Sequence, residues 1–122
     1  MNTLEKAAAI MKRDGFTRGA REDDMGRHCL LGAINKAGEE DDYGEATRFL
    51  ATILRKKIPK DGIVDTFNDR LRVFPNDGDC QSVLAAWNNM ICSGKNEAVD
   101  VLKRAATLFS KRSRRVTIVE SK

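Results

Sequence analysis

The side chains best suited to catalysis are the chain's single histidine, His28, and its direct neighbour Cys29. Cys29 is expected at the start of a helix, a place where thiolate nucleophiles are stabilised. A cysteine nucleophile also needs a base. Adjacent side chains on a helix point about 100° apart, so the imidazole is not expected to reach the thiol. We therefore predict that Cys29 is a small core residue rather than a nucleophile.

A second set of polar residues is a candidate pocket lining. Asn68 and Asp69 follow Phe67, an expected core anchor, and a loop rich in charged residues precedes His28. The functional interpretation is a polar pocket with six lining residues: Arg18, Asp23, Asp24, His28, Asn68 and Asp69. The structural interpretation, which we favour, is that Asn68 and Asp69 hydrogen-bond loop backbone or cap a helix.

The sequence lacks the signatures of metal and nucleotide sites. His28 and the cysteines at 29, 80 and 92 are scattered and do not have the paired spacing of zinc ligands. Residues 77–79 lack the distal glutamate of a calcium loop. Neither a phosphate-binding loop nor a dinucleotide glycine motif occurs. We therefore predict no metal site and no cofactor.

Charge is unevenly distributed along the chain. Residues 103–122 hold seven of the 22 basic residues and one of the 18 acidic ones, so this segment has a net charge of +6 and the rest −2. Five residues here are candidates for phosphate or partner contacts: Arg104, Lys111, Arg112, Arg114 and Arg115. Phosphate contacts by such residues release counterions and give salt-dependent affinity. The plain alternative is a solvated end that keeps the protein soluble, and the sequence leaves both open.

The elements that must position these side chains are expected to be helices. Residues 28–37 read HCLLGAINKA, and their apolar residues cover most of a helical circumference, so they form the predicted central, buried helix. Gly32 weakens this helix by about 1 kcal/mol relative to alanine, and the expected compensation is the close approach of another backbone. Apolar stripes predict further helices at 4–14, 42–58, 79–93 and 96–111, with Thr3 capping the first.

Three stretches are less regular. Residues 63–67 (IVDTF) fit a strand or a short helix, and we favour the short helix, whereas residues 71–74 are expected to be an ordered loop. Residues 116–119 predict an edge strand or a disordered end. The predicted fold is mainly α, a single compact domain of five to six helices around the central helix. This domain spans residues 1–110, and a basic C-terminal tail, residues 111–122, follows it.

Length and composition limit the class of protein. A chain of 122 residues is enough for one domain and not comfortably for two. Its three cysteines are an odd number at unrelated spacings, which indicates reduced thiols and a cytoplasmic protein. No apolar run approaches the ~20 residues of a membrane span, and the N-terminal stretch carries charges that a signal peptide would not.

Four sequence boxes, in this order, resemble an uncharacterised family of small bacterial and phage proteins, a domain of unknown function. The boxes are FTRGA at 16–20, CLLGAI at 29–34, FND at 67–69 and VL at 83–84. The family often has a histidine shortly before the last box, where this chain has Asp79, Cys80 and Gln81. The resemblance covers roughly residues 4–92. It implies a small helical domain with a bacterial or phage source, and no reaction.

We expect a small non-enzymatic interaction protein of phage or mobile-element type. Its helical body would bind a host protein or a second copy of the chain, and its basic tail would add electrostatic attraction. The first alternative is a non-specific nucleic-acid-binding protein that uses the C-terminal lysines and arginines. The second is a small enzyme with Cys29 or Asp69 in a polar pocket. The sequence identifies no particular partner and excludes a membrane-spanning role.

Overall fold

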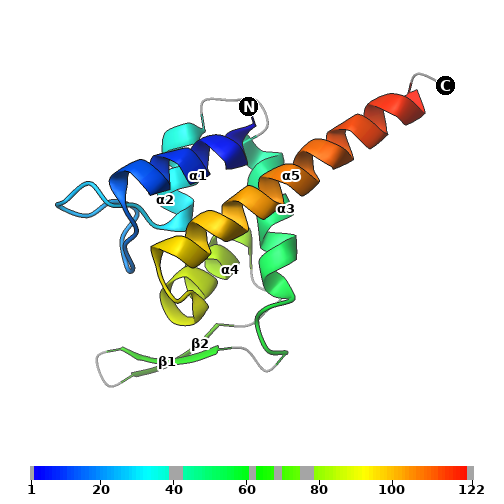
Figure 1. Cartoon of the computed structure of the whole chain (residues 1–122). Coiled ribbons are helices and arrows are strands. Elements are labelled where there is room, and N and C mark those ends of the chain that lie inside the picture. Colours follow the sequence, from blue (N-terminus) through cyan, green and yellow to red (C-terminus); the bar gives the residue numbers. More distant parts are fainter. Residues whose placement is uncertain (1, 39–42, 61–62, 68–69, 75–78, 121–122) are drawn as a thin grey trace.

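The computed structural model describes residues 2–38, 43–60, 63–67, 70–74 and 79–120, with the backbone alone at 43, 63–67, 70–74 and 112–120. Within these ranges, six helical segments and two strands follow one another along the chain (Figure 1). In order they are α1 (Thr3–Asp14), α2 (Leu30–Ala37), α3 (Tyr43–Arg55), β1 (Ile63–Phe67), β2 (Arg70–Phe74), α4 (Cys80–Ala86), the π-helical segment η1 (Trp87–Ile91) and α5 (Lys95–Glu120).

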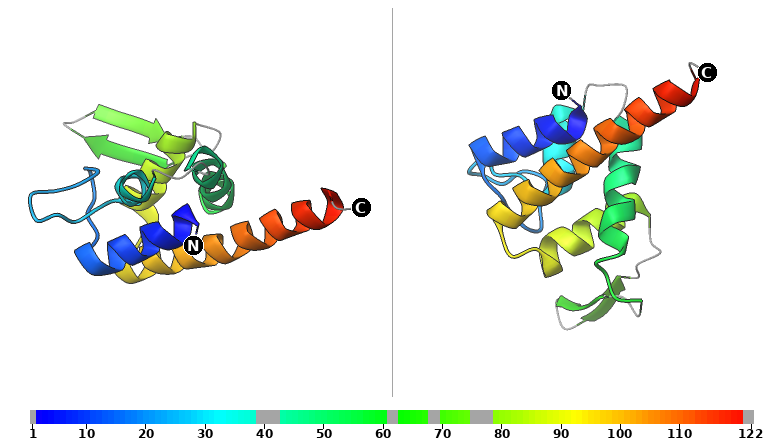
Figure 2. Two further views of the ribbon diagram at one scale, coloured as in Figure 1. Left: turned by 90° about the horizontal axis from the view of Figure 1, so that it is seen from above. Right: turned by 45° about the vertical axis from the view of Figure 1, so that its right-hand side comes forward.

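The fold is mainly α and forms one compact domain, as the sequence predicts. α1 and α5 lie side by side and run in opposite directions, while α2, α3 and α4 pack behind them (Figures 1 and 2). The β1–β2 hairpin lies at the lower edge of the view in Figure 1, next to α4. No helix among the described residues is both long enough and apolar enough to cross a membrane.

α2 is the buried centre that the apolar pattern predicts. Six of its eight residues are buried, and only Asn35 and Lys36 reach the surface. Gly32 has the predicted close backbone neighbour, because a Cβ atom built on it would stand far inside van der Waals contact with the carbonyl oxygen of Arg21. Gly38 follows the last helical residue as the C-cap.

The cap of α1 differs from the prediction. Asn2, and not Thr3, is the N-cap residue: its Oδ1 accepts a hydrogen bond from the N–H of Glu5 at 2.9 Å. The Nδ2 of Asn2 also donates to the carbonyl of Ala106 at 3.1 Å, which ties the start of α1 to the middle of α5. Thr3 is completely buried as the first helical residue. The sequence contains both capping types side by side, so packing decides between them.

The hairpin corrects two predictions. Residues 63–67 form a strand instead of a short helix, and residues 71–74 belong to a second strand instead of a loop. The strands are antiparallel, with Ile63 opposite Phe74 and Phe67 opposite Arg70. The first segment, IVDTF, is rich in β-branched and aromatic residues, and the second, RLRVF, ends in Val73 and Phe74. Two residues separate the segments, the commonest hairpin spacing. Each segment is too short for its own pattern to distinguish strand from helix.

The predicted helix at 79–93 is present, but its last part is wider than an α-helix. Asp79 caps α4 through a 2.8 Å bond from the N–H of Ser82 to its Oδ1. From Trp87 to Ile91 the backbone is π-helical, and the N–H of Cys92 donates to the carbonyl of Trp87 at 2.9 Å. Trp87 and its neighbour Asn88 both belong to this π-helical segment, and both are buried.

α5 is longer than predicted. Its backbone is helical to Glu120, so the edge strand or disordered end expected at 116–119 is wrong, and the helix continues through the domain boundary expected at 110/111. The ring of Phe109 lies 5.4 Å from that of Phe49, which joins α5 to α3. Beyond this contact α5 runs past the rest of the chain toward its C-terminal end (Figures 1 and 2).

Candidate functional site

The loop between α1 and α2 forms one wall of the candidate site. Its ends lie side by side, because the N–H of His28 donates to the carbonyl of Gly15 and the N–H of Thr17 donates to that of His28, both at 3.0 Å. The N–H of Cys29 donates to the carbonyl of Arg21 at 3.3 Å. Since this carbonyl is also the group that faces Gly32, the loop is folded directly onto the start of α2.

Asp23 organises the far end of this loop. Its Oδ1 accepts the N–H groups of Met25 and Arg27 at 3.0 and 2.9 Å, and its Oδ2 lies 2.6 Å from Nε of Arg27. Burial acts to raise the pKa of Asp23, but the hydrogen bonds from Arg27 and Met25 outweigh it and lower the pKa. Asp24 and Met25 are exposed, Met25 to 78%. The Asp23 carboxylate therefore holds a turn together.

His28 is buried in a cluster of charged groups at the end of α1. Its Nε2 lies 2.9 Å from Oδ2 of Asp14, and its Nδ1 lies 3.5 Å from Oε1 of Glu22. Arg13 also donates to Asp14, with Nε 2.7 Å from Oδ1. The hydrogen bond from Arg13, followed by that from His28, holds the pKa of Asp14 well below its ordinary value. Both ring nitrogens face carboxylates, so His28 is not positioned as a base for Cys29.

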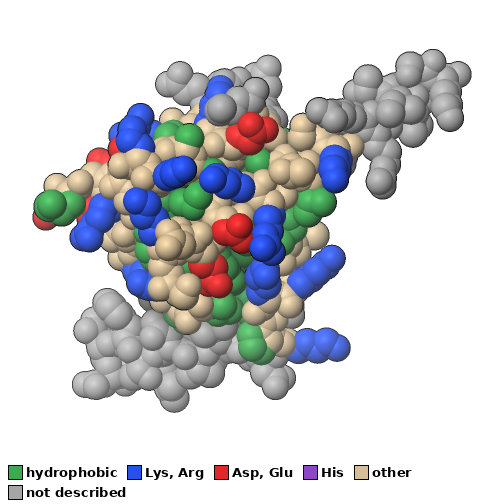
Figure 3. Space-filling model, viewed as in Figure 1, with side chains coloured by type: hydrophobic (Ala, Val, Ile, Leu, Met, Phe, Trp, Pro, Cys, Tyr) green, Lys and Arg blue, Asp and Glu red, His purple; other side chains and the backbone are tan. Residues whose placement is uncertain are grey.

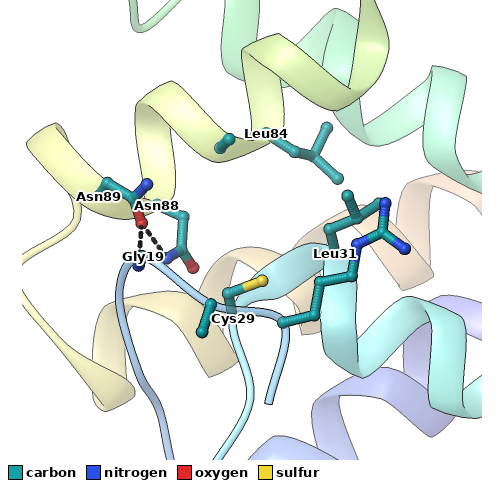
Figure 4. Close-up of a pocket in the computed structure, with 9 residues that line it drawn as sticks. Gly19, Cys29, Leu31, Leu84, Asn88 and Asn89 are labelled. Atoms are coloured by element: carbon teal, nitrogen blue, oxygen red, sulfur yellow. Dashed lines mark hydrogen bonds between the residues drawn. The ribbon is translucent and has the colours of Figure 1, made fainter. Parts of the chain in front are cut away.

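Cys29 is the N-cap residue of α2. Its Sγ accepts a hydrogen bond from the N–H of Gly32 at 3.3 Å, a role that serine or aspartate usually fills. The thiol lines a pocket of about 190 Å³ between the loop, α2 and the α4–η1 segment (Figure 4). The pocket is lined by Gly19, Ala20, Arg21, Cys29, Leu31, Leu84, Ala85, Asn88 and Asn89.

Asn88 joins three parts of the chain behind this pocket. Its Oδ1 accepts the N–H of Leu30 at 3.0 Å, and its Nδ2 donates to the carbonyl of Thr17 at 3.1 Å and to Oδ1 of Asn89. Asn89 in turn accepts the N–H of Gly19 at 3.0 Å (Figure 4). Since Asn88 is 1% exposed and fully hydrogen-bonded, it positions the loop and the first turn of α2 rather than offering free polar groups.

The structure separates the residues of the predicted polar pocket. Arg18 donates to the carbonyl of Cys92 at 2.6 Å and its guanidinium lies 5.0 Å from the ring centre of Phe16. Asp23 and His28 have the separate partners described above, and Asp24 is at the exposed end of the loop. Asn68 and Asp69 lie outside the described residues. None of the described residues among these six lines the pocket in Figure 4.

Sequence reasoning missed the residues that do line this pocket. Asn88 and Asn89 interrupt an otherwise apolar run, VLAAWNNMI at 83–91, and an asparagine pair in such a place is a signal for buried hydrogen bonds. The sequence predicts a small core residue rather than a nucleophile at Cys29. The structure shows that Cys29 is partly buried against the core, and it adds a role that the pattern did not indicate, a helix cap bonded to Gly32. Among the described residues, no three His, Cys, Asp or Glu side chains are grouped as metal ligands would be.

A second candidate site is the outer side of α5. We define the basic face of α5 as Lys103, Arg104, Lys111 and the helix positions of Arg114 and Arg115. The side chains of Lys103, Arg104 and Lys111 are exposed, and Arg104 Nε lies 3.0 Å from Oδ2 of Asp100. For Arg112, Arg114 and Arg115 the structure describes the backbone, which is helical. Lysine and arginine side chains gather over α1 and α5 in Figure 3.

Comparison with known proteins identifies a family for the chain but no activity. The sequence model of a family of unknown function, DUF6197, matches residues 1–108. No curated protein and no solved structure shows significant similarity to the chain. The match confirms the uncharacterised domain that the sequence resemblance predicts. It includes the loop, the pocket and the first half of α5, and it ends before Lys111.

Proposed function

The chain belongs to DUF6197, a family of unknown function, and we propose that it is a small non-enzymatic interaction protein that binds nucleic acid through the basic face of α5. The observation that carries this proposal is the continuation of α5 as one helix of 26 residues, about 39 Å long. Among the side chains of α5 that the structure describes, Phe109 is the last buried one, and the helix backbone continues past the rest of the domain (Figure 1).

The spacing of the basic residues supports a shared binding surface. Positions 104, 111 and 115 are separated by seven and four residues, which brings them to one face of a continuous helix. The buried positions Ala98, Ala105 and Phe109 are on the opposite side. A row of cations along one face of a helix matches the regularly spaced phosphates of a nucleic-acid backbone. Such contacts position a protein without reading the base sequence.

Surface composition favours nucleic acid over the protein partner that the sequence first suggests. The cores of protein–protein interfaces are enriched in aromatic and other apolar side chains and depleted in lysine. In the part of the chain whose side chains are described, the large exposed hydrophobic residues are Met25 and Leu108. Interfaces with nucleic acid are polar and strongly positive, as is the outer side of α5. A protein partner remains the rival outcome of the test below.

The biological setting belongs to the same proposal. The resemblance to bacterial and phage proteins supports a phage or mobile-element protein that works in the cytoplasm of a bacterial host. Binding through phosphates does not require a recognition sequence in the nucleic acid, so the proposed activity is compatible with that setting. The position of the gene among phage or transposon genes would test this part.

The binding test uses a fluorescein-labelled DNA duplex and anisotropy in salt concentrations from about 50 to about 200 mM. The full chain is compared with the triple variant K111A/R114A/R115A and with K56A/K57A/K60A, which removes the same charge from exposed positions near the end of α3. We expect the first variant to reduce the slope of log K against log salt by about 2 to 3, because each phosphate that is no longer neutralised lowers the slope by about 0.9.

Three results would contradict the proposal. They are failure of the full chain to bind the duplex at the lowest salt, an equal loss in the control variant, and an unchanged slope in the α5 variant. Binding of poly-L-glutamate in place of the duplex would support an acidic protein partner instead. Circular dichroism of all three chains checks that the fold is retained. The substituted residues lie outside the described core, so we expect the three spectra to agree.

A further inference from the structure

The seam between α1 and α5 contains two adjoining hollows that share a pair of lysines. Lys12, near the end of α1, and Lys103, on α5, line both. The first hollow, of about 240 Å³, is completed by Lys95, Asn96, Val99 and Asp100. The second, of about 310 Å³, is completed by Glu5, Ala8 and Ala9. We call Lys12, Lys95 and Lys103 the lysine seam.

We propose that the lysine seam is a second phosphate-binding site, which carries a nucleic-acid backbone from the basic face of α5 onto the body of the domain. This inference rests on the proposed function, which identifies nucleic acid as the ligand. It adds a second binding site, separate from the basic face of α5. Lys12 comes from α1 and the other two lysines from α5, so the cations converge from segments that are far apart in the sequence. All three side chains are exposed.

The shape of the seam suits a backbone phosphate. The apolar residues that line the two hollows, Ala8, Ala9 and Val99, have short side chains, so a phosphate oxygen can come close to the helices beside the lysines. Lysine is a compact point charge with a flexible stem, and it tolerates phosphates at varied angles. Asn96 adds an amide that can donate to phosphate oxygen.

The seam is continuous with the basic face of α5. Lys103 belongs to both, and position 114 lies eleven residues further along, three turns of the same helix and about 16 Å away. The seam also lies within the segment that the family model matches, whereas Arg112, Arg114 and Arg115 lie beyond it. The two sites are therefore separable by substitution.

Two carboxylates lie next to the lysines. Asp100 is on the rim of the first hollow and Glu5 on that of the second. Oδ2 of Asp100 is 3.0 Å from Nε of Arg104, and both side chains are exposed, so this ion pair is weak and can exchange for a phosphate. Asp100 thereby opposes an incoming anion. Its replacement by asparagine is expected to strengthen nucleic-acid binding.

The experiment measures duplex DNA binding by the full chain and three variants, with the same salt series. In K12Q/K95Q we expect the slope of log K against log salt to fall by about 1 to 2, and affinity at 0.1 M salt to fall roughly tenfold for each phosphate that is no longer bound. In D100N we expect affinity to rise severalfold. The control K56Q/K57Q, which removes the same charge outside the seam, is expected to retain the wild-type slope.

An unchanged slope in K12Q/K95Q together with unchanged affinity in D100N would overturn the lysine seam. A reduced slope in K111A/R114A/R115A would then still support the α5 site. A full chain that does not bind the duplex at low salt overturns both proposals. The rise expected for D100N cannot arise from misfolding. Because Asp100 also pairs with Arg104 of the basic face, D100N is measured again in an R104Q background, where a rise that persists supports the lysine seam and its loss counts against the seam. Thermal unfolding of each variant checks the fold.

Discussion

Gly32 lies where the second helix touches the loop backbone. Alanine normally stabilises a helix relative to glycine by about 1 kcal/mol. At this position, however, the added Cβ would collide with the carbonyl of Arg21, a backbone group held by its own bond from Cys29. We predict that Gly32→Ala destabilises the protein by about 3 kcal/mol, measured by urea unfolding.

Gly44, in the first turn of α3, is the matched control for this substitution. A Cβ atom there meets nothing within 4 Å, and the backbone has an ordinary helical conformation. Gly44→Ala is therefore expected to raise the free energy of unfolding by up to about 1 kcal/mol. Opposite effects of the same substitution in two helices would identify the contact with Arg21 as the cause, and a stable Gly32→Ala protein would disprove it.

Asp14 makes the protein sensitive to acid. Its carboxyl has an ordinary pKa of 3.8, and hydrogen bonds from Arg13 and His28 hold the folded-state pKa well below that. A depressed carboxyl pKa contributes stability that is complete above the unfolded value and is lost as the pH falls from 3.8 toward the folded value. We predict that the urea midpoint of Asp14→Asn is lower than that of the wild type at neutral pH and declines less below pH 3.8. Parallel declines would show that Asp14 does not contribute.

Among the elements, α5 has one buried face and one exposed face over its described side chains. Two neighbouring residues show the difference. Phe109 is 4% exposed and packs near Phe49, whereas Leu108 is 49% exposed. We predict that Phe109→Ala lowers the free energy of unfolding by about 3 to 5 kcal/mol and that Leu108→Ala lowers it by less than about 1 kcal/mol. Urea unfolding of both variants checks this. Similar losses would mean that α5 is packed differently.

Elements with long periodic stripes were predictable from the sequence, and short ones were not. The apolar pattern of the eight residues of α2 leaves only Asn35 and Lys36 for the surface. In the structure the other six residues are buried, as this pattern predicts. The five-residue strands β1 and β2 satisfy both helical and strand spacing, so the partner strand decides the outcome. The choice of Asn2 over Thr3 as a cap depends on the carbonyl of Ala106, a contact that spans 104 residues of sequence.

For the molecule as a whole, the candidate pocket was harder to predict than the charge distribution. The basic end of the chain is a property of composition, so it can be read directly from residues 103–122. The pocket instead depends on contacts such as Asn88 with Leu30 and Thr17, which join segments about 60 to 70 residues apart. Residue type alone could not indicate that Cys29 would cap a helix or that His28 would face two carboxylates.

The extra residue in the π-helical turn of η1 has a consequence for length variation in the family. A relative with one residue fewer between Trp87 and Ile91 could form an uninterrupted α-helix, but everything after the deletion would rotate by about 100° about the axis. The carbonyl of Cys92 would then no longer meet Arg18, and the loop would lose an anchor. A single-residue gap at this place in an alignment would therefore mark relatives whose loop is fastened differently.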